Sequence, residues 1–144
     1  MFPAIEKKSE DDLEAFQELP TGKECILFVD DEESMAKLNR QRLERLGYKV
    51  IGKTDPSEAL EFFRTNPNQI DLVITDMTMP KMTGDKLVQA ILKIRPDTPI
   101  ILCTGYSEKI SKENAHNLGI RKYIEKPIEM GNLARSVRKV SDRG

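Results

Sequence analysis

Along most of the chain, short apolar runs alternate with segments whose apolar residues have the spacing typical of helices. Residues 25–29 (CILFV), 71–75 (DLVIT) and 99–103 (PIILC) are nearly continuous apolar runs, which are typical of parallel strands buried on both faces of a sheet. Residues 48–53 and 122–125 predict two further strands. Apolar residues three or four positions apart predict helices between the strands. These helices comprise residues 33–46, 54–66, 85–94, 107–119 and 130–140.

Local signals support two of the predicted helices. Over residues 33–46, the apolar stripe consists of Met35, Leu38, Leu43 and Leu46, and Gly47 follows as a helix stop. In the next helix, Asp55 is expected to be the N-cap, with Pro56 at the first helical position.

The alternation of strands and helices predicts the fold class. Five βα units with connections of a few residues favour an α/β fold, in which right-handed crossovers place helices on both faces of a doubly wound, five-stranded parallel sheet. Residues 1–23 are acidic, include two prolines and show little periodicity, so we interpret them as a linker or tail. Residues 24–144 are then expected to form one domain.

Composition narrows the class of protein. Of the 144 residues, 38% are hydrophobic and 33% are charged, as in soluble globular domains. No apolar run approaches the roughly 20 residues of a membrane helix, and no signal-peptide pattern is present, so a cytoplasmic location is expected. The net charge of −1 gives no reason to expect nucleic-acid binding. Cys25 and Cys103 lie in strand-like runs and are expected to be buried, reduced thiols.

Polar residues follow four of the predicted strands, at the edge where such folds bind ligands. Asp30 and Asp31 follow the first strand, Asp76 the third, Thr104 the fourth and Lys126 the fifth. Any one of them alone fits a helix cap or a turn. Together they predict a cluster of three carboxylates, one hydroxyl and one ammonium.

Such a cluster has a specific chemistry. Neighbouring carboxylates raise one another's pKa unless a cation lies among them, and hard oxygen ligands suit Mg²⁺. An aspartate of ordinary pKa, about 3.9, is ionised at neutral pH, and carboxylates form aspartyl phosphates. A metal ion and Lys126 would supply the charge neutralisation that phosphoryl transfer requires. We therefore hypothesise that Asp76 is a phosphoryl acceptor.

Four motifs carry a resemblance to a known family. The stretches FVDDEE, DLVITDMTMPKMTG, IILCTGYS and KYIEKP are similar to those of receiver domains in two-component response regulators, and the likeness covers about residues 24–140. The resemblance implies a flavodoxin-like sheet of order 2-1-3-4-5. Residues 1–23 also resemble the linkers that precede the C-terminal receiver of hybrid sensor histidine kinases.

The resemblance implies roles at the metal and phosphoryl site. Asp76 would accept a phosphoryl group from a phosphohistidine of a histidine kinase or a histidine phosphotransfer protein. Asp31, Asp76 and the backbone carbonyl of Thr78 would ligate Mg²⁺ directly, and Asp30 would act through a water molecule. Lys126 would pair with Asp76 and then with its phosphate.

The resemblance also implies a switch. Thr104 would reach the phosphoryl oxygen and Tyr123 would follow, biasing the face formed by residues 107–119, 122–125 and 130–140. The Lys126–Pro127 bond would be cis. Receivers often dimerise, so a homodimer stays open, whereas direct contact with nucleic acid or a membrane is not expected.

Three other functions remain as alternatives. An Mg²⁺-dependent phosphohydrolase could also use an aspartate nucleophile, but that class has a second aspartate at the place of Thr78 as general acid. A nucleotide-binding α/β domain would need a glycine loop that the sequence lacks. An interaction module without phosphate chemistry would not need all five side-chain types. The resemblance implies a module that accepts and loses its own phosphoryl group rather than a stand-alone enzyme.

Overall fold

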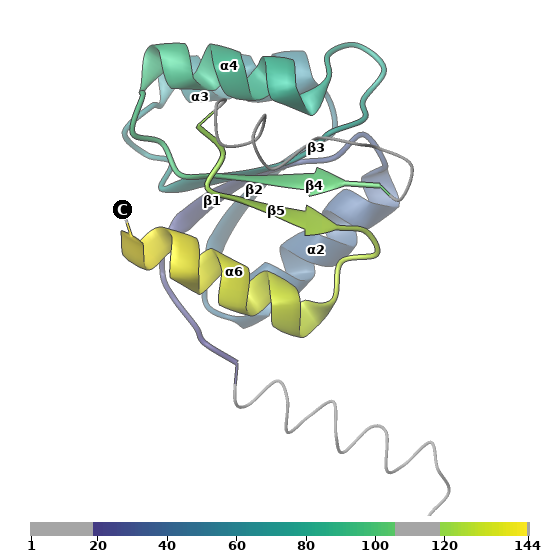
Figure 1. Ribbon diagram of the computed structural model, residues 1–144, viewed down its shortest axis with the longest axis vertical. Helices are drawn as coiled ribbons and strands as arrows, with labels where there is room; N and C mark the ends of the chain where they lie inside the picture. Colours follow the sequence, from purple (N-terminus) through teal and green to yellow (C-terminus); the bar gives the residue numbers. More distant parts are fainter. Residues whose placement is uncertain (1–18, 106–118, 144) are drawn as a thin grey trace, which may run out of the picture.

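One parallel sheet forms the centre of the computed structural model, with helices on both of its faces (Figure 1). The structure describes residues 19–105 and 119–143. The strand order β2-β1-β3-β4-β5 is the doubly wound, flavodoxin-like order that the resemblance implied. The strands are β1 (Cys25–Val29), β2 (Lys49–Lys53), β3 (Leu72–Asp76), β4 (Ile100–Thr104) and β5 (Lys122–Glu125).

Four helices flank the sheet within the described residues. They are α2 (Glu33–Arg45), α3 (Pro56–Thr65), α4 (Gly84–Ile94) and α6 (Met130–Arg143). Helices α2 and α6 cover one face, while α3 and α4 cover the other (Figure 1). The helix predicted for residues 107–119 lies, except for its last residue, outside the described residues. In the described ranges, no helix is long and apolar enough to cross a bilayer.

Alternating side chains of the central strands build two hydrophobic cores. In β1, Ile26 and Phe28 join the core beneath α2 and α6, whereas Leu27 and Val29 join the core beneath α3 and α4. Strands β1, β3 and β4 are buried at every residue, which confirms the prediction from their apolar runs. Both cysteines are buried free thiols, as expected.

Two strands end one residue later than predicted. Asp76 is the last residue of β3 and Thr104 the last of β4, because both continue the ladder, opposite Cys103 and Glu125 respectively. An apolar pattern stops at the first polar side chain, but backbone pairing does not. Both functional candidates are therefore fixed by the sheet rather than by a loop.

The inner face of α2 differs from the predicted stripe. Leu38 is the exposed residue, at 39%, whereas Ala36 and Asn39 are buried together with Leu43. Its core-facing positions thus begin with a small and a polar side chain, which a search for apolar residues overlooks.

Local signals at the helix ends behave as predicted. The Asp55 carboxylate accepts a hydrogen bond from the Ser57 N–H at 2.8 Å, and Pro56 opens α3. Gly47 follows α2 with φ +99°, a conformation that glycine adopts without steric cost. The N–H of Gly47 donates to the Glu44 carbonyl at 3.0 Å, so the chain turns directly from α2 towards β2.

The described end of the acidic segment packs against the sheet and α6. Leu19 is buried in the core beneath α2 and α6, and the Gly22 N–H donates to the Leu46 carbonyl at 3.1 Å. The Arg138 guanidinium donates to the Thr21 carbonyl and to the Glu24 carboxylate, at 3.1 Å each. The boundary between residues 1–23 and 24–144 stays a prediction, although the structure ties residues 19–24 to α6.

Candidate functional site

Three aspartates meet at the carboxyl edge of the sheet. Asp30 and Asp31 directly follow β1, and Asp76 ends the neighbouring strand β3. One carboxylate oxygen from each lies within 4.8 Å of the others. Adjacent parallel strands thus bring together acids that are 45 or more positions apart in the chain, as the sequence predicted.

Lys126, the residue directly after β5, reaches the same cluster. Its ammonium nitrogen lies 3.0 Å from Asp76 Oδ1 and 3.7 Å from Asp30 Oδ2. The Lys126 N–H donates to the Thr104 carbonyl at 2.8 Å, so β4 anchors the residue from which this side chain extends. The Lys126–Pro127 bond is cis, as the resemblance implied.

Burial dominates the electrostatics of Asp30. The residue is 1% exposed, and desolvation raises the pKa of its carboxyl above the usual range, although the Glu32 N–H and the Lys126 charge partly oppose the effect. The Glu32 N–H donates to Asp30 Oδ1 at 3.0 Å. A nearby cation would therefore strengthen the charged form of this carboxylate.

Lys126 keeps its charge despite partial burial. Desolvation alone would lower the pKa of its ammonium, but the hydrogen bond to Asp76 and the charges of Asp30 and Asp76 outweigh it and raise the pKa. On β4, opposite Asp76, burial raises the pKa of the Cys103 thiol to about 12. This sulfur therefore stays a neutral thiol at physiological pH.

The donor set of the cluster fits a hard divalent cation. Three carboxylates face one another, and two of them, Asp30 and Asp76, are buried. Their summed charge exceeds that of the single ammonium of Lys126, and carboxylate oxygens are the ligands that Mg²⁺ prefers. The structure thus shows an aspartate cluster that could hold a metal ion.

The remaining predicted site residues lie at three different places. Thr104 is 5% exposed at the end of β4. Tyr123 is half-buried in β5, opposite Leu102, and packs against the core beneath α3 and α4. Thr78 is exposed, in the loop after β3. The roles assigned to these three residues stay predictions.

The loop between β3 and α4 closes tightly onto Asp76. The Gly84 N–H donates to the Met77 carbonyl at 2.7 Å. A Cβ on Gly84 would lie 2.3 Å from the Asp76 carbonyl oxygen, so only glycine fits this approach. The last residue of the DLVITDMTMPKMTG motif therefore has a steric role beside the candidate acceptor.

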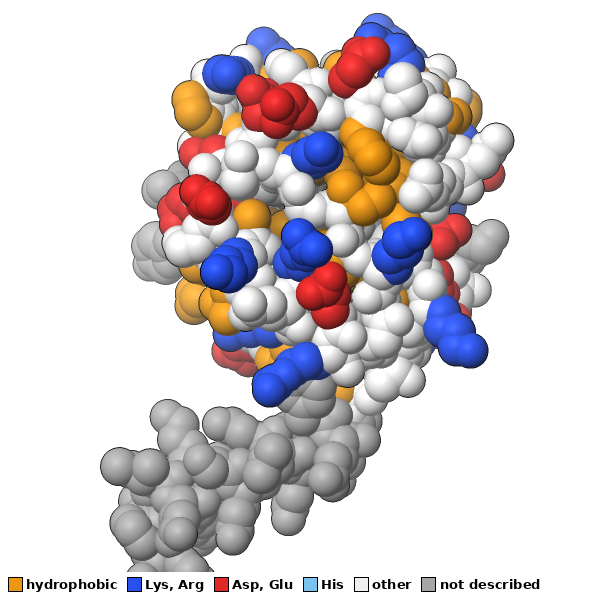
Figure 2. Space-filling view, turned by 180° about the vertical axis from the view of Figure 1, so that it is seen from behind, with side chains coloured by type: hydrophobic (Ala, Val, Ile, Leu, Met, Phe, Trp, Pro, Cys, Tyr) orange, Lys and Arg blue, Asp and Glu red, His pale blue; other side chains and the backbone are white. Residues whose placement is uncertain are grey.

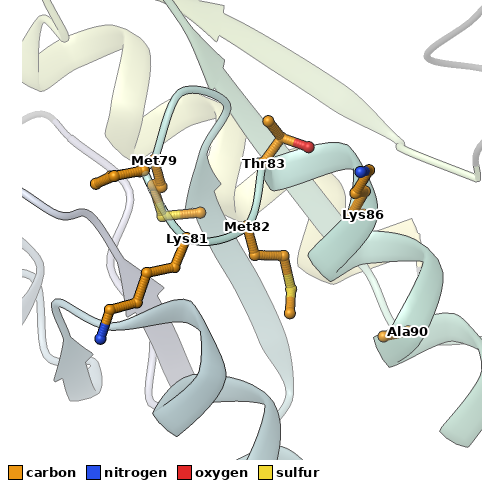
Figure 3. Close-up of a pocket in the computed structure, with 7 residues that line it drawn as sticks. Met79, Lys81, Met82, Thr83, Lys86 and Ala90 are labelled. Atoms are coloured by element: carbon orange, nitrogen blue, oxygen red, sulfur yellow. The ribbon is translucent and has the colours of Figure 1, made fainter.

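Sequence reasoning missed a contact that holds this loop. Lys81 donates to the Asp55 carboxylate at 3.0 Å, so the loop is joined to the N-terminus of α3. Beside it, Met79, Met82 and Lys86 help to line an open cavity of about 370 Å³ (Figure 3). No local pattern signals a contact between residues 26 positions apart.

The face of the molecule opposite to the one seen in Figure 1 carries side chains of both charges. Figure 2 shows basic and acidic side chains interspersed on this face, with a hydrophobic patch in its upper half, where the α3–α4 layer lies. Within this view, neither sign of charge dominates, which is in keeping with the near-neutral balance of the sequence.

Comparison with known proteins identifies the family. Residues 26–138 match the model of the response regulator receiver domain. The chain belongs to the response regulator receiver domain family. It is a receiver of the two-component signalling type, with the fold and the aspartate cluster described above.

Individual relatives support this assignment. The receiver is 38% identical over 122 residues to "Probable transcriptional regulator ycf27" of Porphyridium aerugineum, covering 84% of this chain and 49% of that protein. It is 28% identical over 123 residues to "Sensor kinase CckA" of Brucella abortus (strain 2308), covering 85% of this chain and 13% of that kinase. The receiver thus spans half or less of the length of these curated relatives.

Solved structures agree in fold. A response regulator receiver domain protein from Clostridium thermocellum superposes with a TM-score of 0.80 and 32% identity, covering 83% of this chain and 95% of that one. The receiver domain of the hybrid histidine kinase CckA gives a TM-score of 0.69 and 27% identity, covering 81% and 98%. Nearly whole receiver domains therefore match this chain.

Proposed function

We propose that the receiver accepts a phosphoryl group on Asp76, with Mg²⁺ as its cofactor. The observation that carries the proposal is the pairing of Asp76 with Lys126 at 3.0 Å inside a cluster of three carboxylates. Asp31, Asp76 and the Thr78 carbonyl would hold the ion, and Asp30 would act through a water molecule. Bound Mg²⁺ would neutralise charge on the phosphoryl oxygens.

The receiver's own residues have separate tasks in this reaction. A carboxylate oxygen of Asp76 attacks the phosphorus of a phosphohistidine. A new P–O bond forms and gives an acyl phosphate. The P–N bond breaks, and the histidine nitrogen keeps the electron pair of that bond. The Lys126 ammonium, already beside Asp76, moves its hydrogen bond to the added phosphoryl group.

Two further residues would transmit the change. The Thr104 hydroxyl would donate to a phosphoryl oxygen, and Tyr123 would take the space that Thr104 leaves. Thr104 lies on β4 and Tyr123 on β5, and these two strands are neighbours in the sheet. New contacts to the phosphoryl group bias a two-state element, here the face that includes residues 122–125 and 130–140.

The donor is proposed to be a histidine kinase or a histidine phosphotransfer protein. Support comes from the likeness to the sensor kinase CckA and to the receiver domain of a hybrid histidine kinase. We propose that residues 24–144 are the receiver of such a hybrid kinase and that residues 1–23 are the linker before it. The contacts of residues 19–24 with α6 would then orient this linker on the receiver.

A phosphohydrolase would need an acid that this site does not offer at the expected place. Thr78 stands two residues after Asp76, and a threonine hydroxyl is a poor general acid. We propose that the receiver accepts one phosphoryl group per chain and hydrolyses only that group. Sustained turnover of a small phosphoester such as p-nitrophenyl phosphate would favour the phosphohydrolase.

The experiment is phosphorylation by acetyl phosphate, followed by intact mass. With Mg²⁺, the receiver is expected to gain the mass of one phosphoryl group. The D76N variant and a chelator should each abolish the gain, because the first removes the nucleophile and the second removes the ion.

A matched control separates the loss of the acceptor from the effect of replacing any other aspartate. Asp97 is 83% exposed and pairs with Arg95, so D97N should gain the phosphoryl group like the unaltered receiver. Full labelling of D76N, or labelling that is indifferent to the chelator, would contradict the proposal.

A further inference from the structure

A polar side chain lies where α2 faces the core. Asn39 is fully buried between Ala36 and Leu43 on the inner stripe of the helix. Burying an amide without partners is costly, but both ends of this one are used. Asn39 Nδ2 donates to the Met35 carbonyl at 3.1 Å, and Asn39 Oδ1 accepts from Arg42 Nη1 at 3.3 Å.

Arg42 carries this contact across to another part of the chain. The same Nη1 atom donates to the Ile128 carbonyl at 3.0 Å, and the two residues are 86 positions apart in the chain. Asn39, one turn earlier on α2, fixes the guanidinium in the direction of this carbonyl. Hydrogen bonds from a charged donor are about twice as strong as neutral ones, so the contact holds the segment between β5 and α6.

Ile128 lies two residues after Lys126. Its side chain is buried in the core beneath α2 and α6, and its carbonyl accepts from Arg42. On the other side, the Lys126 N–H is bonded to the Thr104 carbonyl. The short segment 126–128 is therefore held by β4, by the core and by α2, and from it the Lys126 side chain extends to Asp76.

We infer that Arg42, oriented by Asn39, is a positioning residue that sets the location of the Lys126 ammonium over Asp76. The inference rests on the proposed function, because it gives Lys126 a task in phosphoryl transfer. Arg42 does not touch the acceptor. It acts through the Ile128 carbonyl on the segment that carries the lysine.

The test compares labelling rates in a double-mutant cycle. R42M removes the donor to Ile128 and keeps an unbranched apolar side chain at this position, K126M removes the ammonium, and the third protein carries both. R42M should slow labelling by acetyl phosphate about tenfold, a cost in the range of small misplacements. In the K126M background the same change should have no further effect, because residues acting through one group are not additive.

Two more variants keep the test specific. R42K retains a charged donor and should restore most of the rate. R40M is the matched control, since Arg40 lies on the same helix but pairs with Glu44 at the surface, with exposed fractions of 52% and 43%. R40M should label like the unaltered receiver.

Mg²⁺ affinity separates positioning from general disruption. The three carboxylates lie at the ends of β1 and β3, so R42M should leave the dissociation constant for Mg²⁺ within about twofold, or about 0.4 kcal/mol. A loss of Mg²⁺ affinity that parallels the loss of rate would overturn the inference. Equal slowing by R42M with and without Lys126 would overturn it as well.

A spectroscopic readout keeps the inference distinct from the proposed function. In NMR spectra, the Lys126 Cε signal should shift in R42M and stay in place in R40M. If the unaltered receiver took no label at Asp76, the proposed function would fail, and this signal alone would decide the positioning. An unchanged Lys126 signal in R42M would then refute it.

Discussion

Asp31 adds a third negative charge beside two aspartates that share Lys126. It is the exposed member of the cluster, whereas Asp30 and Asp76 are 1% and 5% exposed. Carboxylates this close repel one another when no cation lies among them. The site is therefore expected to lower the stability of the metal-free receiver, a cost common to functional sites.

This expectation is tested by D31N, which keeps the shape of Asp31 and removes its charge. Without Mg²⁺, the variant should be more stable than the unaltered receiver by about 0.5 kcal/mol, as measured by urea denaturation. With saturating Mg²⁺ the order should reverse, because binding to the folded state stabilises the unaltered receiver more. A variant that is less stable without Mg²⁺ would argue against repulsion in the cluster.

At the scale of residues, the sequence predicted the acids and the lysine of the site, but not the contacts that hold the segments around them. Asp30, Asp76 and Lys126 stand directly at strand ends, so topology alone brings them together. Arg42 and Lys81 instead reach partners 86 and 26 positions away. Such contacts depend on the packing of α2 and of the loop after β3, and the periodicity of the sequence does not predict them.

At the scale of elements, Arg138 of α6 holds the segment 19–24 by hydrogen bonds, and Leu19 of the segment is buried in the core beneath α2 and α6. Arg138 donates to the Glu24 carboxylate and to the Thr21 carbonyl. The hydrogen bond from Arg138 holds the pKa of the Glu24 carboxyl below its usual range, against the opposing effect of burial. Both side chains are about three-quarters buried, with exposed fractions of 24% and 25%, so water screens the pair less than it screens an exposed one.

E24Q should therefore destabilise the receiver by about 1 kcal/mol at neutral pH, as measured by urea denaturation. Because the folded pKa of Glu24 is lowered, its contribution is fully present above the unfolded pKa of about 4.3. The contribution is lost as the pH falls through the folded pKa, so the difference between the two proteins should shrink in acid.

The surface pair of Glu61 and Arg64 is the control for this experiment. Its side chains are 63% and 57% exposed, and exposed pairs contribute little. E61Q should leave the stability nearly unchanged at every pH. An equal effect of E61Q and E24Q would contradict the proposed anchoring of the segment by Arg138.

Element boundaries were predicted less well than element types. Every strand was expected at its place, yet β3 and β4 extend to Asp76 and Thr104, since hydrogen-bonded ladders include polar residues. On α2, the pattern favoured Leu38 over Asn39 for the core. A buried amide is tolerated there only because Arg42 and the Met35 carbonyl satisfy it, and this cannot be read from an apolar stripe.

At the scale of the whole molecule, the same central strands serve both cores and the site. Strands β1 and β3 contribute alternate side chains to each core, and their last residues or the loops that follow carry the three aspartates. A fold that buries these strands on both faces thereby fixes the geometry of the cluster. This is why βα alternation and four short motifs sufficed to predict both the fold and the place of the site.

The central claim of this account is that Asp76 takes the phosphoryl group. Its most direct test is peptide mapping by mass spectrometry after the receiver has been incubated with acetyl phosphate and Mg²⁺. The account predicts that the added phosphoryl group is on the peptide containing Asp76 and is released by hydroxylamine, as an acyl phosphate would be. A phosphoryl group on a serine or threonine, or on the peptide containing Asp30 and Asp31, would contradict it.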